Sequence, residues 1–428
     1  MTTGNGGLGG CIQYTDMTYG SDQGFATVGT NNGHDGNYGL PFYQKPEVVK
    51  DFAYRTMRKS IKQGKQIIKE FYGKKQKKSY YLGCSTGGRQ GFREVQDIGT
   101  EFDGVIIGAP AIDFNNLNAW DGHFYPTIGK NTSQDFITPD QWTGLIHNDI
   151  MKKCDGLDGA IDNIIEDSFK CQYKANDLLC QSIPSKDCLT QKQVDIVNAV
   201  YSPLIASNGT LLYPRLTPGG TMAESVRFYF GGHVSAYSDW LEYVIYQDPN
   251  WDPLSFTQDQ WSKPQSVDPA GISSFKGDLS KFKSSGAKLL HYHGSADGII
   301  SPENSPRYYD KVSKTMKLSN KQLDEFYRFF RISGMGHCSG GNGAHFIGNQ
   351  YVNLGSYKPE ENVLWAMVQW VEKGIAPEHI IGSALLNNTA GSPVDYKRKH
   401  CRYPRSNVFS GKGDVKDPNN WNCVYPKK

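Results

Sequence analysis

The sequence lacks the features that assign a chain to a membrane, to nucleic acid or to a zinc-thiolate site. No apolar run in its 428 residues approaches the roughly 18 residues of a membrane-spanning helix. Charged residues make up 21% of the chain and the formal net charge is +3, so no field of one sign favours nucleic acid or a membrane surface. No C-x-x-C pair or Cys/His cluster has the spacing of zinc ligands. We expect a globular protein, long enough for one large domain or two, with neither nucleic acid nor membrane as partner.

Cysteine, by contrast, is plentiful. The nine cysteines are Cys11, Cys84, Cys154, Cys171, Cys180, Cys188, Cys338, Cys401 and Cys423. Several are separated by short intervals, which is typical of locally closed disulfide loops and of an oxidising compartment. Pairing by proximity predicts the bridges Cys154–Cys171, Cys180–Cys188 and Cys401–Cys423. Three N-glycosylation sequons agree with secretion, and they begin at Asn131, Asn208 and Asn387.

The start of the chain shows no signal peptide. Met1 leads almost directly into a glycine-rich run that ends at Gly10, with neither a charged n-region nor an apolar h-region. Since a secreted protein carries such a signal, we expect that an N-terminal portion is absent from this sequence. The odd number of cysteines agrees, because one cysteine would then lack its partner.

The segment 79-SYYLGCSTGGRQG-91 places a serine inside a glycine-rich turn. The aromatic run before Gly83 predicts a buried strand, and the residues from Arg89 onward predict the opening of a helix. Strand, G-x-S-x-G and helix together are the signature of a nucleophile elbow, in which Ser85 presents its hydroxyl at the tip of a sharp turn. A G-x-S-x-G match alone also arises by chance, so the prediction depends on the correct flanks.

Strand and helix patterns alternate at both ends of the chain but not in the middle. We predict strands at 24–30, 79–83, 102–110, 287–294 and 326–332, and helices at 48–71, 191–201, 305–315 and 362–373. The segment 121–286 loses the alternation and is rich in Asp, Asn, Pro, Trp and Tyr, so we interpret it as an insertion. The chain beyond the last predicted helix is loop-rich. The pattern predicts an α/β fold with a large inserted segment.

A nucleophilic serine needs a base and an acid that orients the base. In an α/β-hydrolase these follow in the order Ser, acid, His, each after a strand. Asp297 follows the strand predicted at 287–294, and His337 follows the strand predicted at 326–332. Each could be an ordinary loop residue, but their order favours a triad with Ser85. His291, His293 and His345 are weaker candidates for the base.

Cysteines adjoin both proposed catalytic residues: Cys84 precedes Ser85 and Cys338 follows His337. If the hydroxyl and the imidazole are in contact, their neighbours fall within reach of a disulfide. We therefore predict a Cys84–Cys338 bridge that joins the two catalytic loops. The alternative, a buried free thiol at Cys84, does not explain the second cysteine beside the histidine.

Cys-Ser, Asp and His-Cys in this order resemble the tannase and feruloyl esterase family of secreted fungal and bacterial esterases. Further matching segments are Gly4–Gly7, Gly33–Asp35, Gly83–Gly91, Phe102–Gly104 with Ala109–Ala111, and Gly334–Cys338. The resemblance covers most of the chain. It implies an α/β-hydrolase catalytic domain at 1–120 and 287–428, a lid domain at 121–286, and hydrolysis of carboxylic esters of phenolic acids. It also implies an additional N-terminal segment with a signal peptide, which leaves Cys11 without its partner.

An oxyanion hole follows from the elbow. One donor is expected to be the backbone N–H of Thr86, directly after the nucleophile. The second is expected from an upstream glycine loop, for which we select Gly7. The alternative is that this glycine loop is only a turn.

A second constellation, 154-CDGLDGAIDNIIEDSFKC-171, lies in the insertion. Asp155, Asp158 and Asp162 gather hard oxygen ligands whose repulsion a cation would relieve, which suggests Ca²⁺ with backbone carbonyls completing the shell. A solvated acidic loop closed by a disulfide is the alternative. The family resemblance implies a structural calcium in this segment, with Ala160 and Ile164 supplying carbonyl oxygens.

The leading hypothesis is a secreted serine carboxylic-ester hydrolase, most consistent with a feruloyl esterase that acts on small phenolic esters or feruloylated plant cell-wall polysaccharide. The alternatives are a tannase acting on galloyl esters and a non-catalytic calcium- or carbohydrate-binding relic of the fold. An aromatic lid suits methoxylated cinnamates, and four aromatic residues of the insertion favour this substrate class: Trp240, Tyr243, Tyr246 and Trp251.

Overall fold

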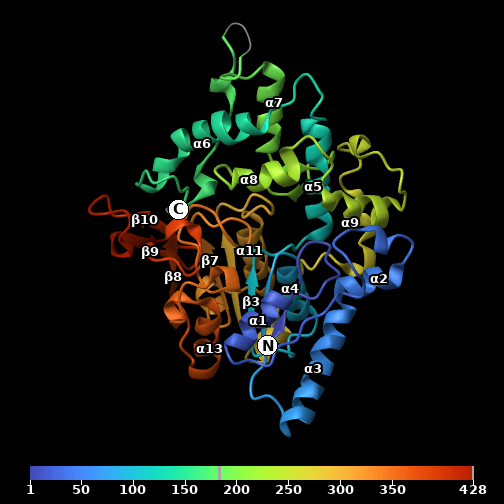
Figure 1. Ribbon diagram of the computed structural model, residues 1–428, viewed down its shortest axis with the longest axis vertical. Coiled ribbons are helices and arrows are strands. Elements are labelled where there is room, and N and C mark those ends of the chain that lie inside the picture. Colours follow the sequence, from blue (N-terminus) through green and yellow to red (C-terminus); the bar gives the residue numbers. More distant parts are fainter. Residues whose placement is uncertain (182–184, 427–428) are drawn as a thin grey trace.

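The computed structural model describes residues 1–181 and 185–426. At its centre, five parallel strands form a sheet in the order β1-β2-β3-β6-β7 (Figure 1). These strands are β1 (Thr2–Thr3), β2 (Tyr80–Cys84), β3 (Gly104–Gly108), β6 (Lys288–Gly294) and β7 (Tyr327–Ile332). Four of them were predicted from the sequence. Because all run in one direction, their carboxyl ends meet at one edge of the sheet.

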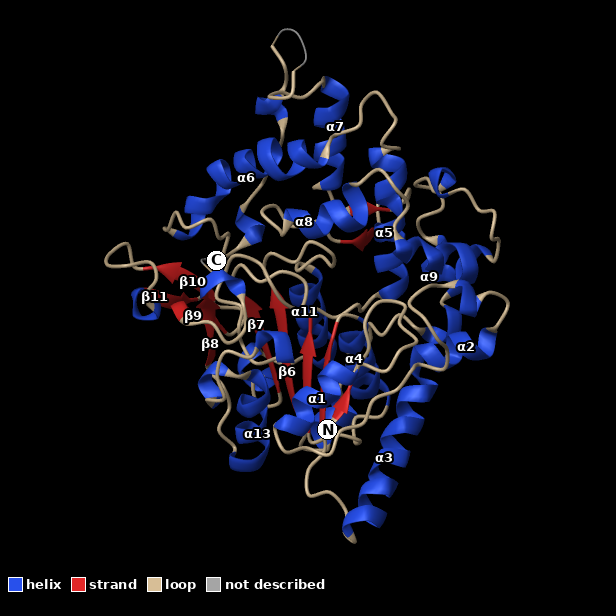
Figure 2. Cartoon of the chain, in the orientation of Figure 1, coloured by secondary structure: helices blue, strands red, loops and turns tan. Residues whose placement is uncertain are grey.

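Helices cover both faces of the sheet, because its strands are apolar at successive rather than alternate positions. On one face, Val105 and Ile107 of β3 belong to a core with α3 (Thr56–Tyr72), α4 (Thr86–Asp97) and α11 (Asn304–Met316). On the other face, Ile106 belongs to a core with α1 (Tyr14–Asp22) and α13 (Val363–Lys373). This arrangement confirms the predicted α/β class (Figure 2).

Most of the chain between β3 and β6 lies across the carboxyl ends of the strands, coloured green to yellow in Figure 1. Its helices are α5 (Phe114–Ile128), α6 (His147–Cys154), α7 (Gln191–Val200), α8 (Met222–Ser225), α9 (Lys263–Val267) and α10 (Ser280–Ser284). A short hairpin joins β4 (Leu204–Ile205) to β5 (Leu211–Tyr213). The inserted segment has an apolar core, in which the rings of Trp142 and Phe230 stack with centroids 4.3 Å apart.

The C-terminal region differs from the loop-rich prediction. β8 (His379–Leu385) pairs with β9 (Val394–Cys401), and β10 (Ser406–Phe409) pairs with β11 (Trp421–Val424), both antiparallel. Hydrophobic periodicity did not reveal β9, because its buried positions include Arg398 and His400, which polar contacts hold in place.

Two predictions in the N-terminal half need correction. Residues 24–30, predicted as a strand, contribute only an isolated bridge between Val28 and Thr2. The predicted helix at 48–71 is present as α2 (Pro46–Lys50), a π-helical turn and α3. Its helical spacing predicted an apolar face that includes Ile67 and Phe71, but these two side chains do not face the core. Their exposed fractions are 64% and 79%, because the last turns of α3 extend past the sheet (Figure 1).

A short helix α12 (Asn320–Leu323) precedes β7. Among the described helices, none has the length and apolar character needed to cross a membrane.

Candidate active site

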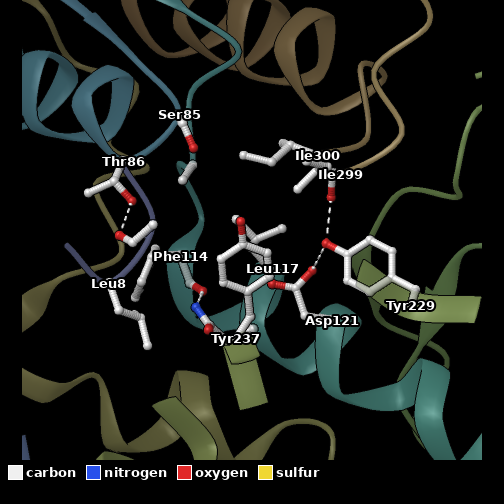
Figure 3. A pocket seen from close by; sticks show the side chains of 13 residues that line it. Leu8, Ser85, Thr86, Phe114, Leu117, Asp121, Tyr229, Tyr237, Ile299 and Ile300 are labelled. Atoms are coloured by element: carbon white, nitrogen blue, oxygen red, sulfur yellow. Dashed lines mark hydrogen bonds between the residues drawn. The ribbon is translucent and has the colours of Figure 1, made fainter. Parts of the chain in front are cut away.

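The predicted nucleophile elbow is present. β2 ends at Cys84, Ser85 turns the chain with φ 62° and ψ −125°, and α4 begins at Thr86. A positive φ strains a residue with a side chain, and such strain is held by the surrounding structure at functional turns. Glycine at position 87 also relieves crowding in the turn, because a Cβ there would lie 3.1 Å from the carbonyl oxygen of Asn5. The half-buried Ser85 directs its hydroxyl toward a cavity (Figure 3).

Asp297 and His337 follow β6 and β7, as the sequence predicted, and their side chains meet. Asp297 Oδ2 lies 2.8 Å from His337 Nδ1. The other carboxylate oxygen accepts hydrogen bonds from the backbone N–H groups of Ile299, at 2.8 Å, and Ile300, at 2.9 Å. These bonds fix the fully buried carboxylate. The imidazole therefore donates Nδ1–H to Asp297, which leaves Nε2 as the basic nitrogen.

The two side chains shift each other's pKa. Burial opposes ionisation of Asp297, but the charge of protonated His337 and hydrogen bonds from His293 and His337 outweigh it and hold the pKa of Asp297 below its ordinary value. Burial likewise lowers the pKa of His337, but the negative charge of Asp297 outweighs burial and raises that pKa above its ordinary value. His293, predicted only as a weaker candidate for the base than His337, instead lies 3.1 Å from Asp297 Oδ2 and helps to hold that carboxylate.

Glu224, in α8 of the inserted segment, also belongs to this site, and it was not predicted from the sequence. Its Oε1 accepts a hydrogen bond from the backbone N–H of His337, at 3.1 Å, and its Oε2 accepts one from Gly298, at 3.0 Å. Burial, with the charge of Asp297 adding to it, raises the pKa of Glu224 to about 7. No motif marks a single glutamate in a short helix, so sequence reasoning had no signal to find it.

The predicted Cys84–Cys338 disulfide is confirmed. It joins residues separated by 254 positions, with Cα atoms 6.0 Å apart, and so brings the elbow to the loop that carries His337. Ser85 and His337 line one cavity. Within the described residues the Ser85 hydroxyl makes no hydrogen bond to the imidazole, and such contacts often tighten only when substrate binds.

The other predicted bridges are also confirmed: Cys154–Cys171, Cys180–Cys188 and Cys401–Cys423. Of the cysteines, all of which lie in the described ranges, Cys11 is free, and it is exposed.

The glycine loop selected for the oxyanion hole lies against the elbow. Thr86 Oγ1 donates a hydrogen bond of 2.7 Å to the carbonyl oxygen of Gly7, and Gly7 has a φ of +55°. Neither the N–H of Gly7 nor that of Thr86 has an acceptor among the described residues. Both residues line the cavity beside Ser85, so their N–H groups remain the candidate oxyanion donors.

Two cavities meet at Ser85. The first is narrow and mostly apolar, and it is lined by Gly7, Leu8, Ser85, Thr86, Ala111, Phe114, Leu117, Asn118, Asp121, Tyr229, Tyr237, Ile299 and Ile300 (Figure 3). The second is wider, contains His337 and has polar side chains along its wall: Asn5, Gln13, Asp16 and Gln350. Ser85 and Tyr237 border both cavities. The serine hydroxyl thus lies between an apolar space and a polar one.

The four aromatic residues from which we predicted a preference for feruloyl groups do not line either of these cavities. Trp240 is buried behind the first cavity, where its ring contacts Phe114 at 5.1 Å between centroids. Tyr243 lines a separate groove, and Tyr246 stacks on Trp251 with centroids 4.7 Å apart. The aromatic lining comes instead from Phe114, Tyr229 and Tyr237.

The acidic loop of the inserted segment folds around its carboxylates. Asp155 accepts hydrogen bonds from the N–H groups of Asn163, at 3.0 Å, and Ile164, at 3.1 Å. Burial, followed by the charges of Glu166 and Asp162, raises the pKa of Asp158 to about 7.

Residues 155–164 have the chemistry of a calcium site, but their side chains alone do not form one. No three His, Cys, Asp or Glu side chains of the described residues are grouped closely enough to hold a metal ion. Arg398 already pairs with Asp162, at 2.6 Å. The carbonyl groups of the buried Ala160 and Ile164 accept no hydrogen bond from described residues. A cation here would therefore take carbonyl as well as carboxylate oxygens, which is the donor set that Ca²⁺ prefers.

The family model and the similar proteins all point to one family. A family model described as "Tannase and feruloyl esterase" matches residues 1–424. The "Probable feruloyl esterase B-2" of Neosartorya fischeri is 50% identical over 426 residues, which are 99% of this chain and 81% of that protein. The "Probable feruloyl esterase B" of Emericella nidulans is 51% identical over 425 residues, 99% of this chain and 80% of that protein.

Solved structures with the same fold carry related titles. "Crystal structure of feruloyl esterase B from Aspergillus oryzae" superposes with a TM-score of 0.95 at 48% identity, covering 99% of this chain and 84% of that one. "Tannin acyl hydrolase from Aspergillus niger" superposes with a TM-score of 0.78 at 22% identity, covering 99% of this chain and 80% of that one, which shows the fold alone.

Proposed function

The chain belongs to the tannase and feruloyl esterase family, and is thus a carboxylic ester hydrolase; we propose that it releases hydroxycinnamic acids, ferulic acid in particular, from their esters. The observation that carries this proposal is the Asp297–His337 contact beside a cavity shared with Ser85. The names of relatives that share half of its residues support the feruloyl group. Small phenolic esters and feruloylated plant cell-wall polysaccharide are the proposed substrates.

The proposed mechanism follows from the positions of the three side chains. His337 Nε2 takes the proton of the Ser85 hydroxyl as its oxygen attacks the ester carbonyl. The imidazolium then gives this proton to the leaving alcohol, and an acyl-enzyme remains. Water, deprotonated by the same nitrogen, attacks the acyl-enzyme and releases the acid. Asp297 keeps Nδ1 protonated and stabilises the imidazolium in both steps.

The N–H groups of Thr86 and Gly7 are the proposed oxyanion donors, since both lie beside Ser85 and neither has an acceptor among the described residues. In water-excluded sites, one such donor contributes about 10²–10³ in kcat. The apolar cavity suits the acyl group, and the polar cavity with His337 suits the leaving alcohol. We propose that residues 121–286 act as a lid domain over 1–120 and 287–428, since Asp121, Tyr229 and Tyr237 help to close the acyl side.

Hydrolysis of methyl ferulate and methyl gallate, assayed side by side, tests the substrate class. We expect kcat/KM to be higher for methyl ferulate. A preference for methyl gallate would instead establish the tannase alternative. Hydrolysis of neither ester by folded protein would favour the non-catalytic alternative.

Glu224→Gln is expected to shift the acid limb of the pH profile of kcat/KM to lower pH. His337 acts as a base, so activity is lost as pH falls through its raised pKa. The charge of Glu224 contributes to that raised value, and removing it lowers the pKa of His337. The exposed Glu325→Gln serves as the matched control. An acid limb unmoved in E224Q, or moved equally in both variants, would contradict this role.

We propose a structural Ca²⁺ held by Asp155, Asp158 and Asp162 with the carbonyl oxygens of Ala160 and Ile164. A bound ion stabilises the folded state, by about 2.7 kcal/mol when free calcium exceeds its Kd a hundredfold. Excess EDTA is thus expected to lower the Tm, and added Ca²⁺ to restore it. In Asp158→Asn the Tm is expected to respond less to calcium. A Tm indifferent to EDTA and calcium in the wild type would refute the site.

We also propose that the protein is secreted and glycosylated. The disulfides support an oxidising compartment. The three sequon asparagines, Asn131, Asn208 and Asn387, are all exposed, as acceptors must be. Protein expressed by a fungal host should lose mass on treatment with an endoglycosidase, and an unchanged mass would remove the glycan part of this proposal.

A further inference from the structure

One face of α5 forms a wall of the apolar cavity beside Ser85. Phe114, Leu117, Asn118 and Asp121 line it, at helical spacings of three, four and seven residues from the first. Asp121 therefore lies about 10 Å along the helix from Phe114. Its side chain is almost completely buried, with an exposed fraction of 5%. A carboxyl group so placed in an apolar wall needs an explanation beyond packing.

Asp121 and Tyr229 share a hydrogen bond whose direction the neighbouring carbonyl determines. The Tyr229 hydroxyl oxygen lies 2.7 Å from Asp121 Oδ1 and 2.8 Å from the carbonyl oxygen of Ile299 (Figure 3). The phenol has one hydrogen, and the carbonyl oxygen can only accept. All three groups are satisfied when Tyr229 donates to Ile299 and a protonated Asp121 donates to Tyr229. Burial favours this neutral form, since it raises the pKa of Asp121 to about 8.

The second oxygen of Asp121 is then a carbonyl-like acceptor. It has no hydrogen-bond partner among the described residues. Figure 3 shows this oxygen directed away from Tyr229, toward the side chains that line the cavity. Asn118, the other short polar side chain of the wall, donates to the carbonyl oxygen of Phe114 at 2.7 Å. Asp121 Oδ2 is thus an acceptor, with no donor of its own, within a mostly apolar space that the hydroxyl-bearing side chains of Ser85 and Tyr237 also line.

We propose that Asp121 Oδ2 accepts a hydrogen bond from the hydroxyl group at the far end of the acyl ring, para to the chain that bears the ester. The inference rests on the proposed function and deepens it, because it makes Asp121 the residue that selects 4-hydroxycinnamoyl groups. The substrate hydroxyl then begins a chain of hydrogen bonds. It donates to Asp121, Asp121 donates to Tyr229, and Tyr229 donates to the carbonyl oxygen of Ile299. Such chains strengthen in a dry site.

The apolar wall and the neutral acceptor together determine which acyl groups the cavity binds. Phe114, Leu117, Ile299 and Ile300 suit an aromatic ring with its propenoyl chain. An acyl group without the 4-hydroxyl leaves Asp121 Oδ2 unpaired, and one with a 4-methoxy group brings no hydrogen to donate. Leaving a buried polar group unpaired is expected to lower the rate by roughly fivefold to 150-fold.

The test compares methyl 4-hydroxycinnamate with methyl cinnamate, which differ by one oxygen atom, and uses methyl 3-hydroxycinnamate as the positional control. The kcat/KM ratio of the first pair is measured in the wild type, in Asp121→Leu and in Asp121→Asn. Asparagine keeps both functions of the neutral acid, an N–H donor for Tyr229 and a carbonyl acceptor for the cavity. Leucine keeps neither. Asp195→Leu, exposed on α7, is the matched control.

We expect the wild type to prefer the 4-hydroxy ester by roughly fivefold to 150-fold. D121N and D195L retain this preference, and D121L loses it. A wild type that hydrolyses both esters equally, or prefers the 3-hydroxy isomer, overturns the inference while leaving the proposed function intact. So does a D121L variant that keeps the preference. If D121L does not fold, loss of the preference in a folded D121N overturns the inference. Hydrolysis of none of the three esters by folded wild type would mean that the proposed function itself fails.

Discussion

Replacing Ser85 with alanine is expected to reduce kcat for methyl ferulate by roughly four to six orders of magnitude. The elbow positions one hydroxyl between the two cavities, next to the proposed oxyanion amides of Thr86 and Gly7 and in the same cavity as His337. Without that oxygen no acyl-enzyme can form, and the remaining acceleration comes only from binding and the oxyanion amides. The measurement is single-substrate kinetics on purified S85A, with circular dichroism to establish that it is folded.

The control for this variant is Ser207→Ala, an exposed serine of the inserted segment. S207A should retain the wild-type kcat. A folded S85A with kcat within tenfold of the wild type would show that another residue is the nucleophile, and the mechanism proposed from the elbow would have to be abandoned.

Removal of the Cys84–Cys338 bridge, as the double alanine variant, is expected to destabilise the protein more than removal of any short-range bridge. The bridge joins residues 254 positions apart, and the chain-entropy model gives a loss of about 5.5 kcal/mol in the free energy of unfolding. The same model gives about 2.5 kcal/mol for Cys180–Cys188, which spans 8 positions. The double alanine variant at Cys180 and Cys188 is therefore the matched control.

Activity should separate the two double variants further. The long-range bridge holds the loop of His337 against the elbow of Ser85, so its loss is expected to lower kcat by about a hundredfold or more. The short bridge touches neither loop, so its loss should leave kcat unchanged. Urea unfolding and kcat at a temperature where both variants are folded provide the measurements. Equal losses in both variants would contradict the proposed role of the long-range bridge in aligning the catalytic loops.

The part of the site that lies on the strand ends could be predicted from the sequence. Buried parallel strands give near-continuous apolar runs, so β3, β6 and β7 were recognisable, and the residues that follow such strands must meet at one edge. Asp297 and His337 were found in this way. The Cys84–Cys338 pair then followed, because the two cysteines adjoin residues that have to be close.

The part of the site that comes from the inserted segment could not be predicted. Glu224 and Asp121 are single acidic residues without a motif, and only the tertiary fold brings them to His337 and to the cavity of Ser85. Sequence analysis also assigned aromatic residues of the inserted segment to the substrate site that do not line it. Trp240 was chosen by composition, yet it is buried behind the cavity, whereas Tyr229 lines the cavity and was not singled out.

The most direct test of the central claim, that Ser85 is a nucleophile activated by His337, is peptide-resolved mass spectrometry after reaction with a fluorophosphonate. We predict one adduct per chain, located on the peptide that contains Ser85. It should be absent from S85A and should form far more slowly in His337→Ala. An adduct on a different serine, or a folded wild-type protein that remains unlabelled, would contradict the account.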